Sequence, residues 1–245
     1  MAVGRIGGTN RRMRPRLVLV HSPLVGCGTW GPVAGELTGQ GYAVAIPDLA
    51  GAVAAVPPYR PRLAQVIADS AAGQDAVLIG HSRAGPLLAA AWSMMPEGEV
   101  RGCIFVDARL PAPGRSWMDT VAPGFACRLR EMADPQGRLP PWPQWWGGEE
   151  ELAALIPDPD TRQRFAAGCP RLPLAILEEV EPATPGWPDA ACGYLQLSAA
   201  YDGEAARARE LGWLVRQHLS HHLALVTEPG QVARELCTLA HAALN

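Results

Sequence analysis

The sequence predicts an α/β fold in which a mostly parallel sheet is flanked by helices and carries a helical cap insertion. Short apolar runs alternate with segments of helical periodicity in the first and last parts of the chain. Residues 110–191 interrupt this alternation with no clear strand, and the interruption is too long for a plain loop. A serine also stands between one apolar run and the next helix. Together these observations predict βαβ units with an inserted segment.

Each expected element follows from a local pattern. Residues 17–20 form a buried parallel strand of the β-branched type, and later apolar runs repeat that pattern. The expected strands are 17–20, 42–46, 75–79, 100–106, 193–197 and 213–216. The expected helices are 30–39, 59–72, 84–95, 125–133, 149–156, 160–167, 203–211 and 229–243.

These elements divide the chain into four parts. Residues 1–15 lack periodicity and are expected to form a mobile N-terminal tail. Residues 16–109 and 192–245 are expected to build one α/β core domain. Residues 110–191, rich in proline and tryptophan, are expected to form the cap or lid.

The composition limits the partners and the enzyme classes that the chain can have. With 48% apolar residues and a net charge of −3, the chain predicts a globular protein with a small-molecule substrate and no nucleic-acid partner. No apolar run approaches a membrane span, so we expect no membrane partner and a cytoplasmic location, with the oligomeric state left open. The chain contains no lysine, which excludes Walker-A phosphate loops and pyridoxal-phosphate enzymes. The scattered cysteines and histidines predict no metal site.

Ser82 is the candidate nucleophile. It lies in Gly80-His81-Ser82-Arg83-Ala84-Gly85, directly after an apolar strand and before a helix. A sharp strand-to-helix turn needs small residues around the serine, and Gly80, Ala84 and Gly85 supply them. The alternative is that Ser82 only caps the helix.

From Arg16 onward, the chain resembles an α/β-hydrolase, and it is similar to small bacterial esterases and to the salicylate esterase and hydroxynitrile lyase group. In that family the catalytic histidine usually precedes a proline by seven residues. His222 and Pro229 have this spacing, which favours His222 over His221 as the base.

Two aspartates are candidates for the acid that orients the histidine. Asp202 lies after the strand that follows the insertion, where the family usually places this acid, but it also suits a helix N-cap. Asp107 ends the strand after that of Ser82 and is costly to bury without a partner. We favour Asp107 and retain Asp202 as the alternative.

Several further residues are expected around the nucleophile. The backbone N–H groups of Arg83 and Leu24 are the expected oxyanion donors, because Pro23 has no N–H. His21 is expected to shape this loop beside the substrate pocket, and the Arg83 side chain either binds a substrate carboxylate or forms a structural ion pair. Three tryptophans of the insertion would either line the pocket or form the insertion's own core: Trp142, Trp145 and Trp146.

The resulting hypothesis is a serine hydrolase that cleaves a small carboxylic ester or related acyl substrate, with no metal or organic cofactor. Two alternatives stay open. One is a non-hydrolytic enzyme of the same fold, such as a lyase or cyclase, and the other is a non-catalytic small-molecule binder.

Overall fold

The computed structural model describes residues 14–187 and 191–244 and contains a six-stranded parallel sheet. The strands pair in the order β2-β1-β3-β4-β5-β6, every pair being parallel. Their bounds are β1 (Arg16–Val20), β2 (Val44–Ala45), β3 (Ala76–His81), β4 (Val100–Val106), β5 (Ala191–Gln196) and β6 (Leu214–Gln217). The α/β prediction is thereby confirmed.

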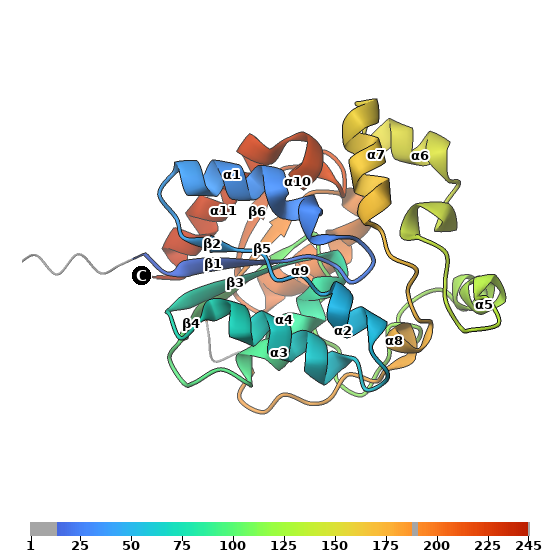
Figure 1. Cartoon of the computed structure of the whole chain (residues 1–245). Coiled ribbons are helices and arrows are strands. Elements are labelled where there is room, and N and C mark those ends of the chain that lie inside the picture. The colour runs from blue at the N-terminus through green and yellow to red at the C-terminus, as the bar shows by residue number, and fades with distance from the viewer. Residues whose placement is uncertain (1–13, 188–190, 245) are drawn as a thin grey trace, which may run out of the picture.

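Helices cover both faces of this sheet (Figure 1). The helices of the core are α1 (Gly31–Gly39), α2 (Ala50–Ala54), α3 (Arg60–Ala71), α4 (Gly85–Trp92), α9 (Asp202–Glu210), α10 (Ala224–Thr227) and α11 (Pro229–Ala242). Helices α1 and α11 pack together on one face, and α3 and α4 pack together on the other. Two apolar cores result, one on each side of the sheet.

The segment between β4 and β5 forms short helices at one end of the sheet (Figure 1). These helices are α5 (Pro123–Met132), α6 (Glu149–Leu155), α7 (Pro159–Gly168) and α8 (Ala175–Glu178), with a 3-10 turn at Trp142–Trp145. Helix α7 touches the loop after β1, where a Cβ on Gly26 would lie 2.8 Å from the carbonyl oxygen of Gly168. The inserted segment therefore lies over the loops that follow the strands.

Several expected elements differ in extent from the observed ones. Strand β2 covers two residues of the expected 42–46, because it lies at the edge of the sheet and pairs only with β1. Helices α2, α8 and α10 were not expected, because four or five residues are too few to show a helical period. The expected N-terminal tail lies outside the described residues, apart from its last two.

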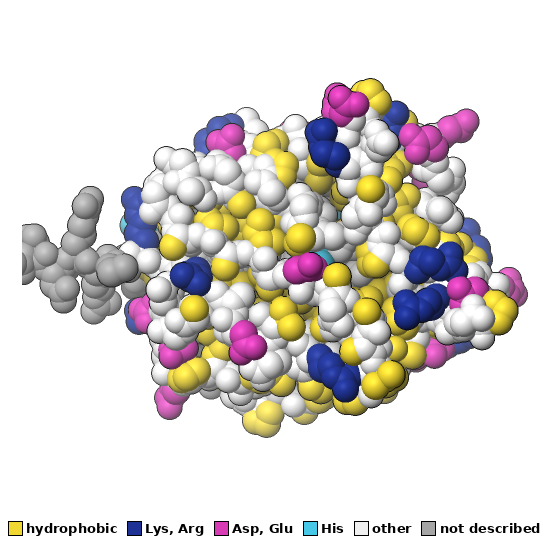
Figure 2. Space-filling model, in the orientation of Figure 1, with side chains coloured by type: hydrophobic (Ala, Val, Ile, Leu, Met, Phe, Trp, Pro, Cys, Tyr) yellow, Lys and Arg dark blue, Asp and Glu magenta, His cyan; other side chains and the backbone are white. Residues whose placement is uncertain are grey.

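The described residues include no helix long and apolar enough to cross a membrane. On the face drawn in Figure 2, acidic and basic side chains are interspersed among apolar ones, and neither sign forms a continuous patch.

Candidate active site

Ser82 lies on a tight turn between β3 and α4. Its φ is +59°, in the left-handed region that non-glycine residues rarely adopt. A Cβ on Gly85 would lie 2.1 Å from the carbonyl oxygen of Arg109, and a Cβ on Gly80 would lie 3.1 Å from the Leu88 side chain. Gly80 and Gly85 are therefore required by close contacts, and the backbone is strained at Ser82 and also at Asp107, whose φ is +42°.

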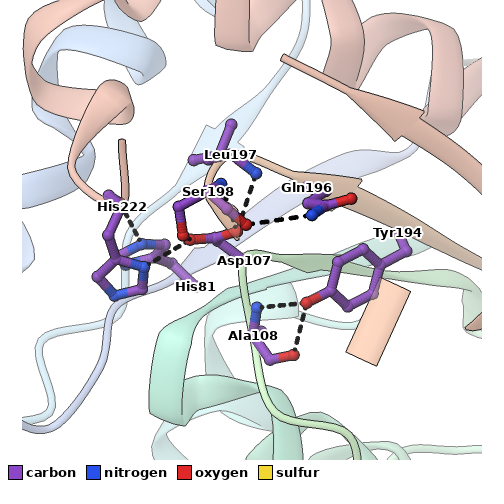
Figure 3. Close-up of polar contacts among 8 residues, drawn as sticks. All are labelled: His81, Asp107, Ala108, Tyr194, Gln196, Leu197, Ser198 and His222. Atoms are coloured by element: carbon purple, nitrogen blue, oxygen red, sulfur yellow. Dashed lines mark hydrogen bonds and ion pairs between the residues drawn. The ribbon is translucent and has the colours of Figure 1, made fainter. Parts of the chain in front are cut away.

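Asp107 lies directly after β4, and its side chain is completely buried. Its Oδ2 lies 2.7 Å from Nδ1 of His222 (Figure 3). Oδ1 accepts hydrogen bonds from the backbone N–H groups of Leu197, at 2.9 Å, and Ser198, at 3.0 Å. Oδ2 also accepts a bond of 2.6 Å from the Ser198 hydroxyl. These donors compensate for the burial of the carboxylate.

The charge state of Asp107 follows from this environment. Burial alone would raise the pKa of Asp107, but the bonds from His222, Ser198 and Leu197 outweigh it and hold the pKa below the usual value. The ionised carboxylate favours the proton of His222 on Nδ1, which leaves Nε2 able to accept a proton. The pair can therefore act as an oriented general base.

Two further rings contact His222, and sequence analysis assigned a role to neither. The ring centroid of His81 lies 4.4 Å from that of His222, and His81 Nε2 donates to the His222 carbonyl oxygen at 3.0 Å. Burial and the nearby His222 lower the pKa of His81 to about 3, so His81 stays neutral. Tyr201 stacks on His222 with centroids 5.1 Å apart and an interplanar angle of 7°. Both contacts restrict the rotation of the imidazole.

Tyr201 also contacts Ser82. Its side chain interacts with that of Ser82, while burial raises the pKa of Tyr201 to about 12 and keeps the phenol protonated. The only sequence signal for Tyr201 was its place in the loop after β5, next to Asp202.

The other histidine of the pair, His221, makes different contacts. Its Nε2 lies 3.0 Å from the Thr227 hydroxyl and 3.9 Å from a carboxylate oxygen of Glu228. The structure thus brings His222, and not His221, to a buried carboxylate.

The loop after β1 offers fewer free N–H donors than expected. Pro23 has no N–H, and the N–H of Leu24 donates to the Ser22 hydroxyl at 3.2 Å. Leu24 can serve an oxyanion only after that hydroxyl turns away. His21 is buried, with Nδ1 2.9 Å from the Ser22 carbonyl oxygen and Nε2 accepting from the Leu49 N–H at 3.2 Å. Both ring nitrogens anchor the loop, and the place of His21 beside a substrate pocket stays a prediction.

The three tryptophans of the insertion are in different environments. The Trp142 ring centroid lies 6.4 Å from that of His222, so Trp142 faces the site. Trp145 is buried in the insertion, and its indole N–H donates to a backbone carbonyl there. Trp146 is 44% exposed and stacks on Phe125. Trp145 and Trp146 therefore contribute to the insertion's own packing, and a pocket role for any of the three tryptophans stays a prediction.

Arg83 follows Ser82 directly, so its backbone N–H belongs to the turn that carries Ser82. Its guanidinium carbon lies 4.9 Å from the Trp117 ring centroid. In residues 14–187 and 191–244, no three His, Cys, Asp or Glu side chains are grouped closely enough to hold a metal ion.

The sequence matches the model of a known protein family. A family model described as the alpha/beta hydrolase family matches residues 17–235, most of the chain. The chain belongs to the alpha/beta hydrolase family. A comparison with curated protein sequences gave no match.

Several solved structures have the same fold as this chain. An extracellular α/β-hydrolase from a Paenibacillus species, described as homologous to tobacco salicylic acid binding protein 2, is 19% identical with a TM-score of 0.74, over 92% of this chain and 98% of that one. A pyrethroid hydrolase from Sphingobium faniae JZ-2 is 20% identical with a TM-score of 0.71, over 93% and 98%. Tomato methylketone synthase I, complexed with 2-tridecanone, is 17% identical with a TM-score of 0.64, over 94% and 99%.

In this alpha/beta hydrolase, the second candidate acid lies away from the histidine. Asp202 is the first residue of α9, and its Oδ1 accepts a bond of 2.5 Å from Gln196 Nε2. The same Nε2 donates to the Ser198 carbonyl oxygen at 3.1 Å. Asp202 therefore supports the turn that carries Ser198, and of the two aspartates only Asp107 contacts His222.

Proposed function

We propose that the protein is a serine hydrolase that cleaves a small carboxylic ester or related acyl substrate through Ser82, His222 and Asp107. The observation that carries this proposal is the 2.7 Å contact between His222 Nδ1 and the fully buried Asp107 carboxylate. Ser82 lies on a strained turn, and Tyr201 contacts both Ser82 and His222. Burying a carboxylate costs free energy, and three donors besides His222 are needed to stabilise Asp107. The simplest use of such a carboxylate is to hold an imidazole for proton transfer.

The proposed reaction gives each of these residues one role. His222 Nε2 takes the proton of the Ser82 hydroxyl as Oγ attacks the acyl carbon, and Asp107 stabilises the imidazolium. The Arg83 N–H and, once the Ser22 hydroxyl has turned, the Leu24 N–H donate to the oxyanion. The intermediate collapses to an acyl-enzyme as His222 gives its proton to the leaving alcohol. Water, deprotonated by His222, then releases the carboxylic acid and restores Ser82.

Residues 110–191 serve in this proposal as a cap over the reacting groups. Their helices lie over the loops that follow the strands, and Trp142 brings an apolar ring to within 6.4 Å of His222. A cap of this kind excludes bulk water and selects the acyl or alcohol part of the substrate.

Active-site labelling tests the proposal. A fluorophosphonate probe is expected to attach to Ser82 of the wild-type chain, as mass spectrometry of peptides would show, because an activated serine attacks phosphorus as it attacks an acyl carbon. Ser82→Ala should abolish both labelling and the hydrolysis of short p-nitrophenyl esters. Unchanged ester turnover in Ser82→Ala would refute the mechanism, and absent labelling in the wild type would favour a non-catalytic binder.

The oxyanion loop favours one second candidate, a non-hydrolytic enzyme such as a lyase or cyclase. Pro23 offers no donor and the Leu24 N–H is held by Ser22, so the loop presents no free donor at either position in this structure. Reaction in H₂¹⁸O separates the two candidates, because hydrolysis places ¹⁸O in the acid product and a lyase or cyclase does not.

Stacking of Tyr201 on His222 predicts a graded effect on turnover. Tyr201→Ala removes the ring and is expected to lower kcat about tenfold, since an aromatic pair contributes roughly 0.5–1.5 kcal/mol. Tyr201→Phe keeps the ring and should retain most of the activity. Steady-state ester hydrolysis measures both variants, and a loss in Tyr201→Phe equal to that in Tyr201→Ala would assign the effect to the hydroxyl near Ser82 instead.

A further inference from the structure

A cavity of about 370 Å³ opens beside the turn that carries Ser82. Helix α9, the turn after Ser82 and the segment after β4 contribute to its wall. Its charged lining residues are Arg83, Arg109, Arg115, Arg207, Glu181 and Glu204. Four arginines face two glutamates, so the cavity has an excess of positive charge.

Both glutamates are already paired. Glu204 lies 2.6 Å from the guanidinium of Arg109. Glu181 lies 3.6 Å from that of Arg60 and also accepts a 2.7 Å bond from the Ala112 N–H. Within the described residues, neither glutamate forms an ion pair with Arg83.

Arg83 is the buried arginine of the cavity, and Glu181 acts on it only from beyond ion-pair distance. Its Nε is sealed from solvent and has no hydrogen-bond partner, and it forms no ion pair in the described part of the chain. Burial, assisted by the nearby charge of Arg60, lowers the pKa of Arg83 to about 9. Contact with the Trp117 ring, 4.9 Å from the guanidinium carbon, holds the group in place. A buried cation that no carboxylate contacts directly is costly, and a bound anion would relieve that cost.

This cavity adjoins the reacting centre. Arg83 is the residue after Ser82, and the N–H of Arg109 donates to the Ser82 carbonyl oxygen at 3.2 Å. Adjacent Cα atoms are only about 3.8 Å apart, so the Arg83 side chain leaves the backbone next to Ser82.

We infer that this cavity binds a carboxylate of the substrate, so that the preferred esters carry a free carboxylate a short carbon chain away from the scissile bond. The inference rests on the proposed hydrolase function. A guanidinium binds a carboxylate through two parallel hydrogen bonds along one edge of its plane. The guanidinium of Arg83 lies against the Trp117 ring, which leaves its edge for such a contact.

Paired esters test the inference. Monomethyl glutarate and dimethyl glutarate differ in one charge, and the wild type is expected to cleave the anionic ester with a kcat/KM at least tenfold higher per ester group, the factor expected of one charge-assisted pair. Arg83→Gln should reduce that ratio to about one, and Arg83→Lys should restore part of it. Arg164→Gln, an exposed arginine on α7, is the matched control and should leave the ratio unchanged.

A binding readout is independent of turnover. Ser82→Ala should melt at a higher temperature in monomethyl glutarate than in the same concentration of dimethyl glutarate, and the added Arg83→Gln change should remove the difference. Equal wild-type kcat/KM for the two esters, or equal melting temperatures, would overturn the carboxylate site. Absent fluorophosphonate labelling of Ser82 would refute the hydrolase mechanism instead, so the two failures are distinguishable.

Discussion

Asp107→Asn is expected to lower kcat/KM for ester hydrolysis by on the order of 10⁴. The substitution preserves the shape of the side chain, but an amide presents only one acceptor where the carboxylate now binds His222, Ser198 and Leu197. A neutral amide also cannot stabilise the imidazolium that forms during the attack. Steady-state kinetics measures the loss, and circular dichroism checks that the variant folds.

The matched control is Asp202→Asn. Asp202 contacts Gln196, and its effect on catalysis passes through the turn at Ser198, so a loss of less than about tenfold is expected. A loss of 10⁴ in Asp202→Asn together with an active Asp107→Asn would show that Asp202 is the acid in solution.

Gly85→Ala is expected to destabilise the fold by about 3 kcal/mol, because the new Cβ would lie 2.1 Å from the backbone oxygen of Arg109. That oxygen belongs to the backbone after β4, so the clash can be relieved only by moving α4 away from the sheet. Thermal unfolding should show a fall in Tm on the order of 10 °C for a chain of this length.

Gly35→Ala provides the comparison. Gly35 lies in α1, where a Cβ would have no other atom within 4 Å, and alanine is the better helix former by roughly 0.5–1 kcal/mol. This variant should therefore be slightly more stable than the wild type. Equal unfolding temperatures for the two alanine variants would contradict the close contact at Gly85.

The sheet and the serine turn could be predicted because their signals are local. The strand at Val100–Val106 was expected with its observed bounds, since a continuous apolar run between turn residues defines it. Gly80 and Gly85 could be assigned because the sterics of a strand-to-helix turn depend on adjacent residues.

The acid could not be settled from the sequence because its partners are remote. Asp107 and His222 are 115 positions apart, and the donors of Ser198 and Leu197 meet Asp107 only because β4 and β5 are neighbours in the sheet. Strand order is a property of the whole fold, and no local pattern encodes it. Tyr201 was missed for the same reason.

Two adjacent tryptophans show a second limit of prediction from the sequence. Trp145 and Trp146 differ in burial although they are consecutive, because the 3-10 turn at Trp142–Trp145 points successive side chains in different directions. Apolar composition alone could not tell which ring faces His222.

The position of Asp107 at the end of β4 has a consequence for engineering. Asp107, directly after β4, supplies the carboxylate that contacts His222. The segment after β5 contributes the Ser198 hydroxyl to that carboxylate, and the residues that follow Ser198 need not supply the acid. The same segment contributes Gly203 and Glu204 to the arginine-rich cavity. Under the proposed function, libraries confined to these two positions are expected to vary ester selectivity and to leave proton transfer through His222 intact.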